Sequence, residues 1–282
     1  MAFVVSTIRP IRVWRRRPAA GVRGPRETSA HSSARATTCA PTIPKRTPNV
    51  RATPHQPTAA PSARPTTAAQ ALRILLEGNR RFVTGRPRHP NQDAARRRHG
   101  VNEQRPFAVV LGCSDSRLAA EIIFDRGLGD LFVVRTVGHL VGTDVLASVE
   151  FGVTALRTPL VVVLGHDNCQ AIGAAIRAYD TGMMPPGFLR HIVERLSPEI
   201  VTAHTAGITE SDAIGMRHVR NTTELLLDRS RPLADAVAGH RSAVVGLTYQ
   251  LDNGRVHVVA RHGLDIVSDQ ERGTAVTTML AR

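Results

Sequence analysis

The chain has 282 residues and a formal net charge of +14 at pH 7, which is enough length for one large α/β domain or two small ones. Eleven of the fourteen excess positive charges lie in residues 1–67, so the rest of the chain is nearly charge-balanced and no nucleic-acid-binding face is indicated. No stretch approaches the roughly 18–20 apolar residues that a membrane span needs, and we expect a soluble protein with no membrane partner.

Residues 1–67 are predicted to be a disordered basic extension. They hold ten of the eighteen prolines, are rich in Ser, Thr and Ala, and contain one acidic residue, Glu27. Such a segment cannot bury enough apolar surface to offset the entropy lost on ordering. Two interpretations stay open, an Arg-rich organellar transit peptide and an extension without function. We expect a cytoplasmic protein, with import into an organelle if the extension is a transit peptide.

The ordered domain is predicted to span residues 68–282 and to begin with a helix. Gly85 and Pro87 follow where this helix should end, and a polar, basic stretch continues to Arg105. Apolar residues recur before them at the spacing of one helical face: Ala68, Ala71, Leu72, Leu75 and Leu76.

Three short apolar runs come next, at residues 107–111, 131–134 and 160–164. Runs without polar alternation are typical of strands buried on both faces of a parallel sheet. Helical patterns lie between and after them, for example at residues 172–179. This alternation predicts an α/β fold with a mainly parallel central sheet flanked by helices.

A β-hairpin is predicted near the end of the domain. Residues 243–251 and 256–260 have strand character, and Asp252-Asn253-Gly254 lies between them. Asn-Gly provides the positive φ that a tight hairpin turn requires.

Two of the predicted strands end in residues that can bind a metal ion. The first runs into Cys113, and the third runs into His166 and Cys169. Ligands of open α/β sheets bind just past the carboxyl ends of the strands, so the three side chains can converge. Two Cys and one His form a zinc set with an open fourth position, and thiolates argue against magnesium or calcium. A disulfide or redox pair between the cysteines stays open, but it leaves His166 without a role.

The motifs around these residues resemble those of the beta-class carbonic anhydrases. Cys-x-Asp-x-Arg follows the first strand and His-x-x-Cys follows the third. The resemblance implies the fold of that class and a zinc-dependent carbonate dehydratase, a lyase with one Zn²⁺ per chain. Such an enzyme hydrates carbon dioxide reversibly to bicarbonate by a zinc-bound hydroxide. Similar segments cover nearly the whole ordered domain: residues 77–82, 135–139, 148–153 and 246–249.

By this resemblance Cys113, His166 and Cys169 are the zinc ligands, and Asp115 and Arg117 form a catalytic dyad beside the metal. A carboxylate at Asp115 can accept a hydrogen bond from the hydroxide. The planar guanidinium of Arg117 suits a carboxylate, so it can hold Asp115 away from the metal.

The resemblance also implies two substrate-binding residues and an oligomer. Gln104 would hydrogen-bond the substrate, carbon dioxide or bicarbonate, by reaching across a dimer interface, and Phe151 would line the small apolar pocket for carbon dioxide. The assembly would be a homodimer or tetramer. The alternatives are a solvated loop residue at Gln104 and a core residue at Phe151.

The sequence departs from the family pattern at several positions. Gln170 replaces a glycine after the second cysteine, Thr136 and His139 replace two asparagines, and Phe151 lacks a tyrosine hydroxyl. His139 and His218 are candidate proton shuttles, although a histidine in a folded domain is more often structural. Two alternatives therefore stay open: a hydrolase of carbonyl sulfide or carbon disulfide on the same zinc site, and a zinc-binding homologue without catalysis.

Overall fold

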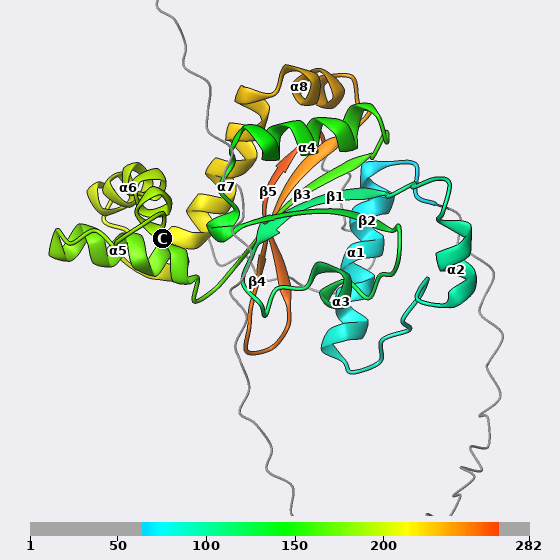
Figure 1. Cartoon of the computed structure of the whole chain (residues 1–282), viewed down its shortest axis with the longest axis horizontal. Helices are drawn as coiled ribbons and strands as arrows, with labels where there is room; N and C mark the ends of the chain where they lie inside the picture. The colour runs from blue at the N-terminus through cyan, green and yellow to red at the C-terminus, as the bar shows by residue number, and fades with distance from the viewer. Residues whose placement is uncertain (1–63, 265–282) are drawn as a thin grey trace, which may run out of the picture. The chain divides into compact units, whose positions relative to one another are not determined.

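The computed structural model describes residues 64–264, so the predicted extension lies outside the described residues except for its last four. Within the described part the chain forms an α/β fold around one sheet (Figure 1). The elements in chain order are α1 (Ala68–Val83), α2 (Ala94–His99), β1 (Ala108–Cys113), α3 (Ala120–Ile123), β2 (Leu131–Thr136), the 3-10 turn η1 (Val137–His139), α4 (Thr143–Thr154), β3 (Leu160–His166), α5 (Gln170–Thr181), α6 (Leu189–Thr205), α7 (Ser211–Arg229), α8 (Arg231–Ala238), β4 (Ala243–Tyr249) and β5 (Val256–His262).

The sheet confirms the predicted parallel topology. Its strand order is β2-β1-β3-β4-β5. The first four strands are parallel, and β5 returns antiparallel to β4 through the predicted hairpin. Gly254 in the turn has φ +73°, the left-handed conformation that a glycine adopts without strain.

Both faces of the sheet are covered, which explains the unbroken apolar runs. Val110 of β1 belongs to a core that includes residues of α1, α3, α5 and α6. Its neighbours Val109 and Leu111 point to the opposite face and belong to a second core with α4, α7 and α8. Figure 1 shows α4 and α8 on one side of the sheet and α1 and α3 on the other. Because alternate residues of a strand face opposite sides, a strand between two layers is apolar throughout.

The first helix begins where the sequence predicts. Thr67 accepts a hydrogen bond from the Gln70 amide, and the Gln70 side chain accepts one from the Thr67 amide, which completes a capping box. Arg64, before the cap, donates to the carbonyl of Pro106 at 2.6 Å. This contact lies inside the stretch that the sequence assigned to the extension.

The polar, basic stretch before Arg105, for which the sequence predicted no element, contains the short helix α2. Asp93 caps it by accepting from the Arg96 amide at 2.7 Å. Past the sheet, α5 and α6 pack against each other (Figure 1). Within residues 64–264 no helix has both the length and the apolar character needed to cross a bilayer.

Candidate metal centre

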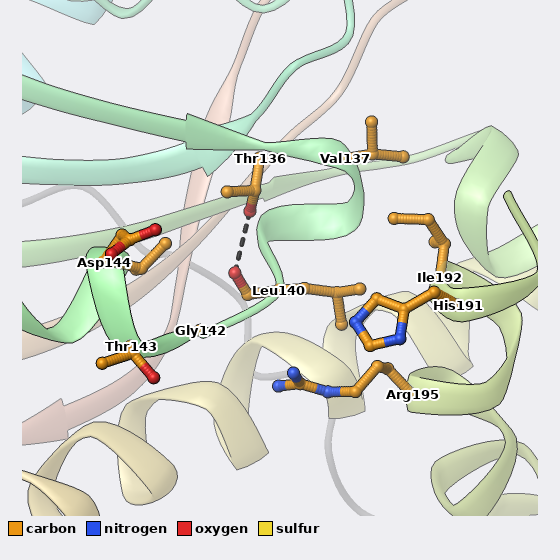
Figure 2. Close-up of a pocket in the computed structure, with 10 residues that line it drawn as sticks. Thr136, Val137, Leu140, Gly142, Thr143, Asp144, His191, Ile192 and Arg195 are labelled. Carbon is orange, nitrogen blue, oxygen red and sulfur yellow. Dashed lines mark hydrogen bonds between the residues drawn. The ribbon is translucent and has the colours of Figure 1, made fainter. Parts of the chain in front are cut away.

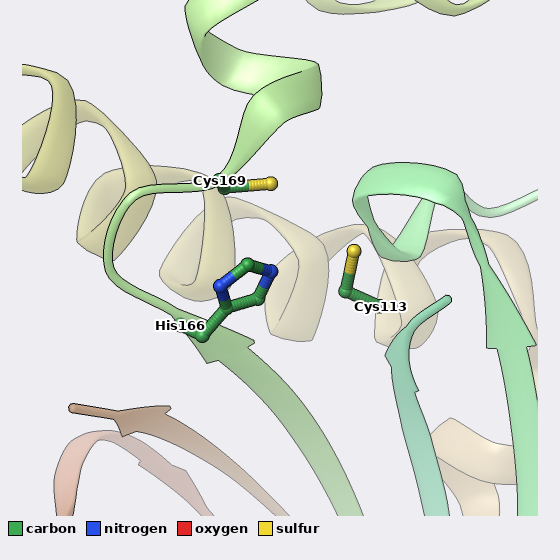
Figure 3. Close-up of side chains that lie close together, drawn as sticks. All are labelled: Cys113, His166 and Cys169. Atoms are coloured by element: carbon green, nitrogen blue, oxygen red, sulfur yellow. The ribbon is translucent and has the colours of Figure 1, made fainter. Parts of the chain in front are cut away.

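The three predicted ligands come together at one edge of the sheet. Cys113 is the last residue of β1, His166 is the last residue of β3, and Cys169 directly precedes α5. Because β1 and β3 are parallel neighbours, their carboxyl ends lie side by side. One ligand atom from each of the three residues lies within 4.8 Å of the others, and Figure 3 shows the two sulfur atoms and the imidazole facing a common space.

The residues present fit a zinc ion. The Nε2 atom of His166 is buried and has no hydrogen-bond partner among the described residues, although its Nδ1 lies 2.7 Å from the carbonyl of Asp167. A carbonyl only accepts, so Nδ1 carries the hydrogen and the lone pair of Nε2 is directed into the cluster. The two cysteines are not bridged in this structure, so both sulfur atoms are available to a metal ion. A Cys₂His set is one that catalytic zinc uses.

The cluster stabilises a thiolate at Cys113. The hydrogen bond from the neighbouring Cys169 thiol lowers the pKa of Cys113 to about 4 despite its burial. The hydrogen bond to Cys113, together with burial, raises the pKa of Cys169. Burial alone lowers the pKa of His166, but the charge of the nearby Cys113 thiolate outweighs burial and raises it. Negative charge therefore accumulates where a cation would bind.

The Asp115–Arg117 pair stands beside the cluster. Arg117 donates from Nε to Oδ1 at 2.9 Å and from Nη2 to Oδ2 at 2.7 Å, and its amide donates to Oδ1 at 3.0 Å. These bonds hold the pKa of Asp115 well below its usual range, so the group is a carboxylate at neutral pH. Its Oδ2 atom lies 3.9 Å from Nε2 of His166. A fixed carboxylate thus faces the ligand cluster.

Arg135, in β2, and Gly138, just after β2, brace the segment after β1. Arg135 donates to the carbonyl of Cys113 at 3.0 Å and to that of Asp115 at 2.7 Å. The amide of Gly138 donates to Sγ of Cys113 at 3.4 Å. The sequence showed Arg135 and Gly138 only as parts of a family-like motif, because nothing local to residues 113–117 indicates partners some twenty residues away.

The segment after β3 is held mainly by bonds that involve its backbone. Asn168 has φ +49°, and its amide donates to Oδ1 of Asp212 on α7 at 2.9 Å. Asp167 donates its amide to the carbonyl of Tyr249, and its carboxylate accepts from the Leu251 amide at 3.0 Å. Sequence reasoning missed Asp212, which has no motif that distinguishes it from other acidic residues at a helix start.

The remaining predicted residues lie away from the three ligands or on the surface. Gln104 is exposed in the loop before β1. Phe151, on α4, is 47% exposed, and its ring lies 6.0 Å from that of Phe132. Gln170, at the start of α5, is exposed.

The two candidate proton shuttles are buried. His139 is 2% exposed and His218 is 4% exposed. Both nitrogens of His218 have acceptors within the protein, at 2.7 and 2.8 Å. Neither ring is placed to exchange protons with solvent, which agrees with the structural interpretation of these histidines.

A cavity of about 280 Å³ lies between the loop after β2 and α6 (Figure 2). The hydroxyl of Thr136 closes one wall by donating to the carbonyl of Leu140 at 2.9 Å, and Arg195 donates to the carbonyl of Val141 at 2.5 Å. None of its lining residues belongs to the ligand cluster or to the Asp115–Arg117 pair. The metal centre is therefore a separate feature.

Known proteins are similar to this chain in sequence and in fold. A family model described as carbonic anhydrase matches residues 108–256. Carbonic anhydrase 2 of Mycobacterium tuberculosis is 48% identical over 190 residues, covering 67% of this chain and 92% of the relative. The carbonic anhydrase of Mycolicibacterium smegmatis is 48% identical over 203 residues, which cover 72% of this chain and 97% of the relative.

Two solved structures show the same fold at lower identity. A beta-carbonic anhydrase of Sordaria macrospora, from a pair described as tetrameric, has a TM-score of 0.53 at 21% identity and covers 67% of this chain and 96% of its own. The Coccomyxa beta-carbonic anhydrase has a TM-score of 0.52 at 22% identity, and the match covers 66% of this chain and 85% of that structure. The likeness to these two structures concerns the fold.

Proposed function

Because this chain belongs to the carbonic anhydrase family and has the fold of its beta class, we propose that it hydrates carbon dioxide reversibly to bicarbonate with one bound zinc ion. Carbonic anhydrases are lyases, carbonate dehydratases. The observation that carries the proposal is the Cys₂His cluster, whose three ligand atoms lie within 4.8 Å of one another. The Asp115 carboxylate, paired with Arg117, stands beside it. We assign the activity to residues 68–282, since α1 begins directly after its Thr67 cap, and we treat residues 1–67 as an extension to that domain.

Cys113, His166 and Cys169 would hold the zinc ion. Three protein ligands are the usual number at a catalytic zinc, because a fourth position must stay available. When bound, zinc supplies the Lewis acidity that makes a water molecule nucleophilic near neutral pH. The two thiolates supply negative charge, and His166 is fixed in the tautomer that binds through Nε2.

Asp115 would orient the attacking water. Its carboxylate can accept one hydrogen of that water and thereby direct an oxygen lone pair at the carbon of carbon dioxide. Arg117 keeps the carboxylate in this orientation through two parallel hydrogen bonds. The pair leaves Asp115 ionised and limits its freedom to approach the three ligands.

Gln104 and Phe151 would bind substrate in a homodimer or tetramer. Both are exposed in the single chain, so both are accessible to a second copy. Sedimentation velocity on the purified chain, with Gln104→Ala assayed for hydration, tests this part. A monomer with full activity would contradict it.

The central experiment combines metal analysis with catalysis on the purified full chain. We expect one zinc per chain and carbon dioxide hydration in stopped flow. Both should be lost after a chelator and restored by added zinc. Stoichiometric zinc without hydration would contradict catalysis but keep the metal site, whereas hydration without zinc would contradict the metal site. Carbonyl sulfide, tested as a substrate alongside, distinguishes the hydrolase alternative.

A further inference from the structure

A buried histidine outside the ligand set is connected to one of its thiols. His218 lies on α7 and is 4% exposed. Its Nδ1 is 2.7 Å from Oε2 of Glu199 on α6, and its Nε2 is 2.8 Å from the carbonyl of Gly138. The amide of the same Gly138 donates to Sγ of Cys113 at 3.4 Å. Glu199, His218, Gly138 and Cys113 therefore form a continuous chain of hydrogen bonds.

The direction of these bonds follows from the chemistry of the partners. A carbonyl only accepts, so Nε2 of His218 carries the hydrogen that it donates to Gly138. The contact of Nδ1 with Glu199 holds the ring in this orientation.

The position of Gly138 is tightly constrained. Its φ of 65° and ψ of 22° are left-handed, and a Cβ at this position would lie 3.0 Å from Cβ of Ala171, two residues after Cys169. The ring of His139 stacks on that of His218 with centroids 4.3 Å apart. Burial keeps the pKa of His139 well below its usual value, so this neighbour stays neutral beside His218.

We propose that His218, held by Glu199, is a positioning residue that fixes Gly138 so that its amide donates to the Cys113 sulfur. The inference rests on the proposed role of Cys113 as a metal ligand, but the hydrogen-bond chain itself is a property of the protein. An N–H bond to a thiolate withdraws charge from the sulfur. Losing it should make Cys113 a stronger electron donor and a less well oriented ligand.

Two readouts test the proposal in the purified full chain. The first is hydrogen exchange of the Gly138 amide by NMR, with the Leu164 amide of β3 as an internal reference for global opening. The second is the thiolate-to-metal charge-transfer band after cobalt replaces zinc. Replacing His218 with Phe keeps a ring against His139 but removes the donor. We expect faster exchange at Gly138 relative to Leu164, a band at lower energy, and about tenfold weaker zinc binding.

Matched variants separate positioning from structural support. His218→Gln keeps an N–H near the position of Nε2 and should restore the wild-type band and exchange rate. Glu199→Ala should shift both readouts in the direction of His218→Phe, while Glu199→Gln, which still holds the ring, should not. His204→Phe is the control. His204 lies on α6, its ring centroid is 4.4 Å from that of Tyr179, and it takes no part in the hydrogen-bond chain from Glu199 to Cys113. This substitution should leave both readouts unchanged.

The outcomes distinguish this inference from the proposed function. Unchanged Gly138 exchange and an unchanged band in His218→Phe would overturn the positioning role, even in a protein that binds zinc and hydrates carbon dioxide. The positioning role would also be overturned if His204→Phe changed both readouts as much as His218→Phe does. A wild-type protein that binds no metal, but whose Gly138 exchange responds to His218, would overturn the proposed function alone.

Discussion

The segments after β1 and after β3 both carry ligands, but they are held in different ways. Residues 113–117 are braced by charged side chains, with Arg135 on two carbonyls and Arg117 on the Asp115 carboxylate. Residues 166–169 are braced through amides and carbonyls, with Asp212 as an outside acceptor. The first segment presents a group that can act on a substrate, whereas the second presents only fixed donors to a metal.

The difference has a physical reason in exposure. The Arg117 side chain is 48% exposed, and an exposed ion pair contributes little to stability. Its value is therefore the orientation of Asp115. The second segment gains rigidity from backbone amides that donate to the Tyr249 carbonyl and to the Asp212 carboxylate. Substitutions in the two segments should accordingly separate effects on turnover from effects on metal binding.

The largest expected effect is common to both segments. Cys113→Ser, His166→Ala and Cys169→Ser should each lose zinc and hydration activity together, because three ligands leave none to spare. Metal content and stopped-flow hydration on each purified variant measure this. Near-stoichiometric zinc with a normal rate in any one of them would contradict the ligand assignment and remove the basis of the comparison.

The next effect should be confined to the first segment. Arg117→Ala should keep zinc but lower turnover roughly 100-fold or more, because an unpaired Asp115, already 3.9 Å from Nε2 of His166, becomes a competing fourth ligand. Cobalt spectra with and without thiocyanate measure the open position. Thiocyanate should not perturb the spectrum of this variant.

Asp115→Asn is the matched control for that prediction. It removes the carboxylate and with it the competing ligand, so zinc should stay, turnover should fall for lack of the hydrogen-bond acceptor, and thiocyanate should perturb the cobalt spectrum. Full activity and an open site in Arg117→Ala would show that Arg117 does not restrain Asp115.

The first segment was more accessible to sequence analysis than the second. Cys113, Asp115 and Arg117 lie within five residues, so their contacts are local and a motif contains them. The convergence of Cys113 with His166 and Cys169 also followed from sequence, because apolar runs that end in glycine marked two buried parallel strands. The helix from Ala68 and the antiparallel hairpin were predicted for equally local reasons.

What the sequence did not show depends on contacts between distant residues. Asp212 is 44 positions from Asn168, and His218 is 80 positions from Gly138. No periodicity links such pairs, since they meet only when α7 packs on the sheet. The helix α2 was missed because its arginines have no apolar face, and it depends on the Asp93 cap.

A smaller effect should be confined to the second segment. Asp212→Ala removes the acceptor of the Asn168 amide, which should loosen the ligand-bearing turn and weaken zinc binding about tenfold, with little change in the turnover of the zinc-loaded enzyme. Competition with a chelator measures the affinity. Asp212→Asn keeps an acceptor oxygen and serves as the control. Equal weakening in both variants would assign the effect to charge and not to the hydrogen bond.

The smallest expected effect tests whether the backbone itself holds the second segment. Asn168 has φ +49° and an exposed side chain, and asparagine tolerates this left-handed conformation better than alanine does. Asn168→Ala should therefore lower the thermal unfolding midpoint by about 2–4 °C, with zinc content unchanged. Asn168→Gly should stay close to wild type, because relief of the left-handed strain is offset by the larger entropy of glycine in the unfolded chain. Differential scanning fluorimetry of the three zinc-loaded proteins measures the shifts. If alanine unfolds with the wild-type midpoint, the turn is imposed by Asp212 and the neighbouring strands, and the conformational preference of residue 168 contributes nothing to it.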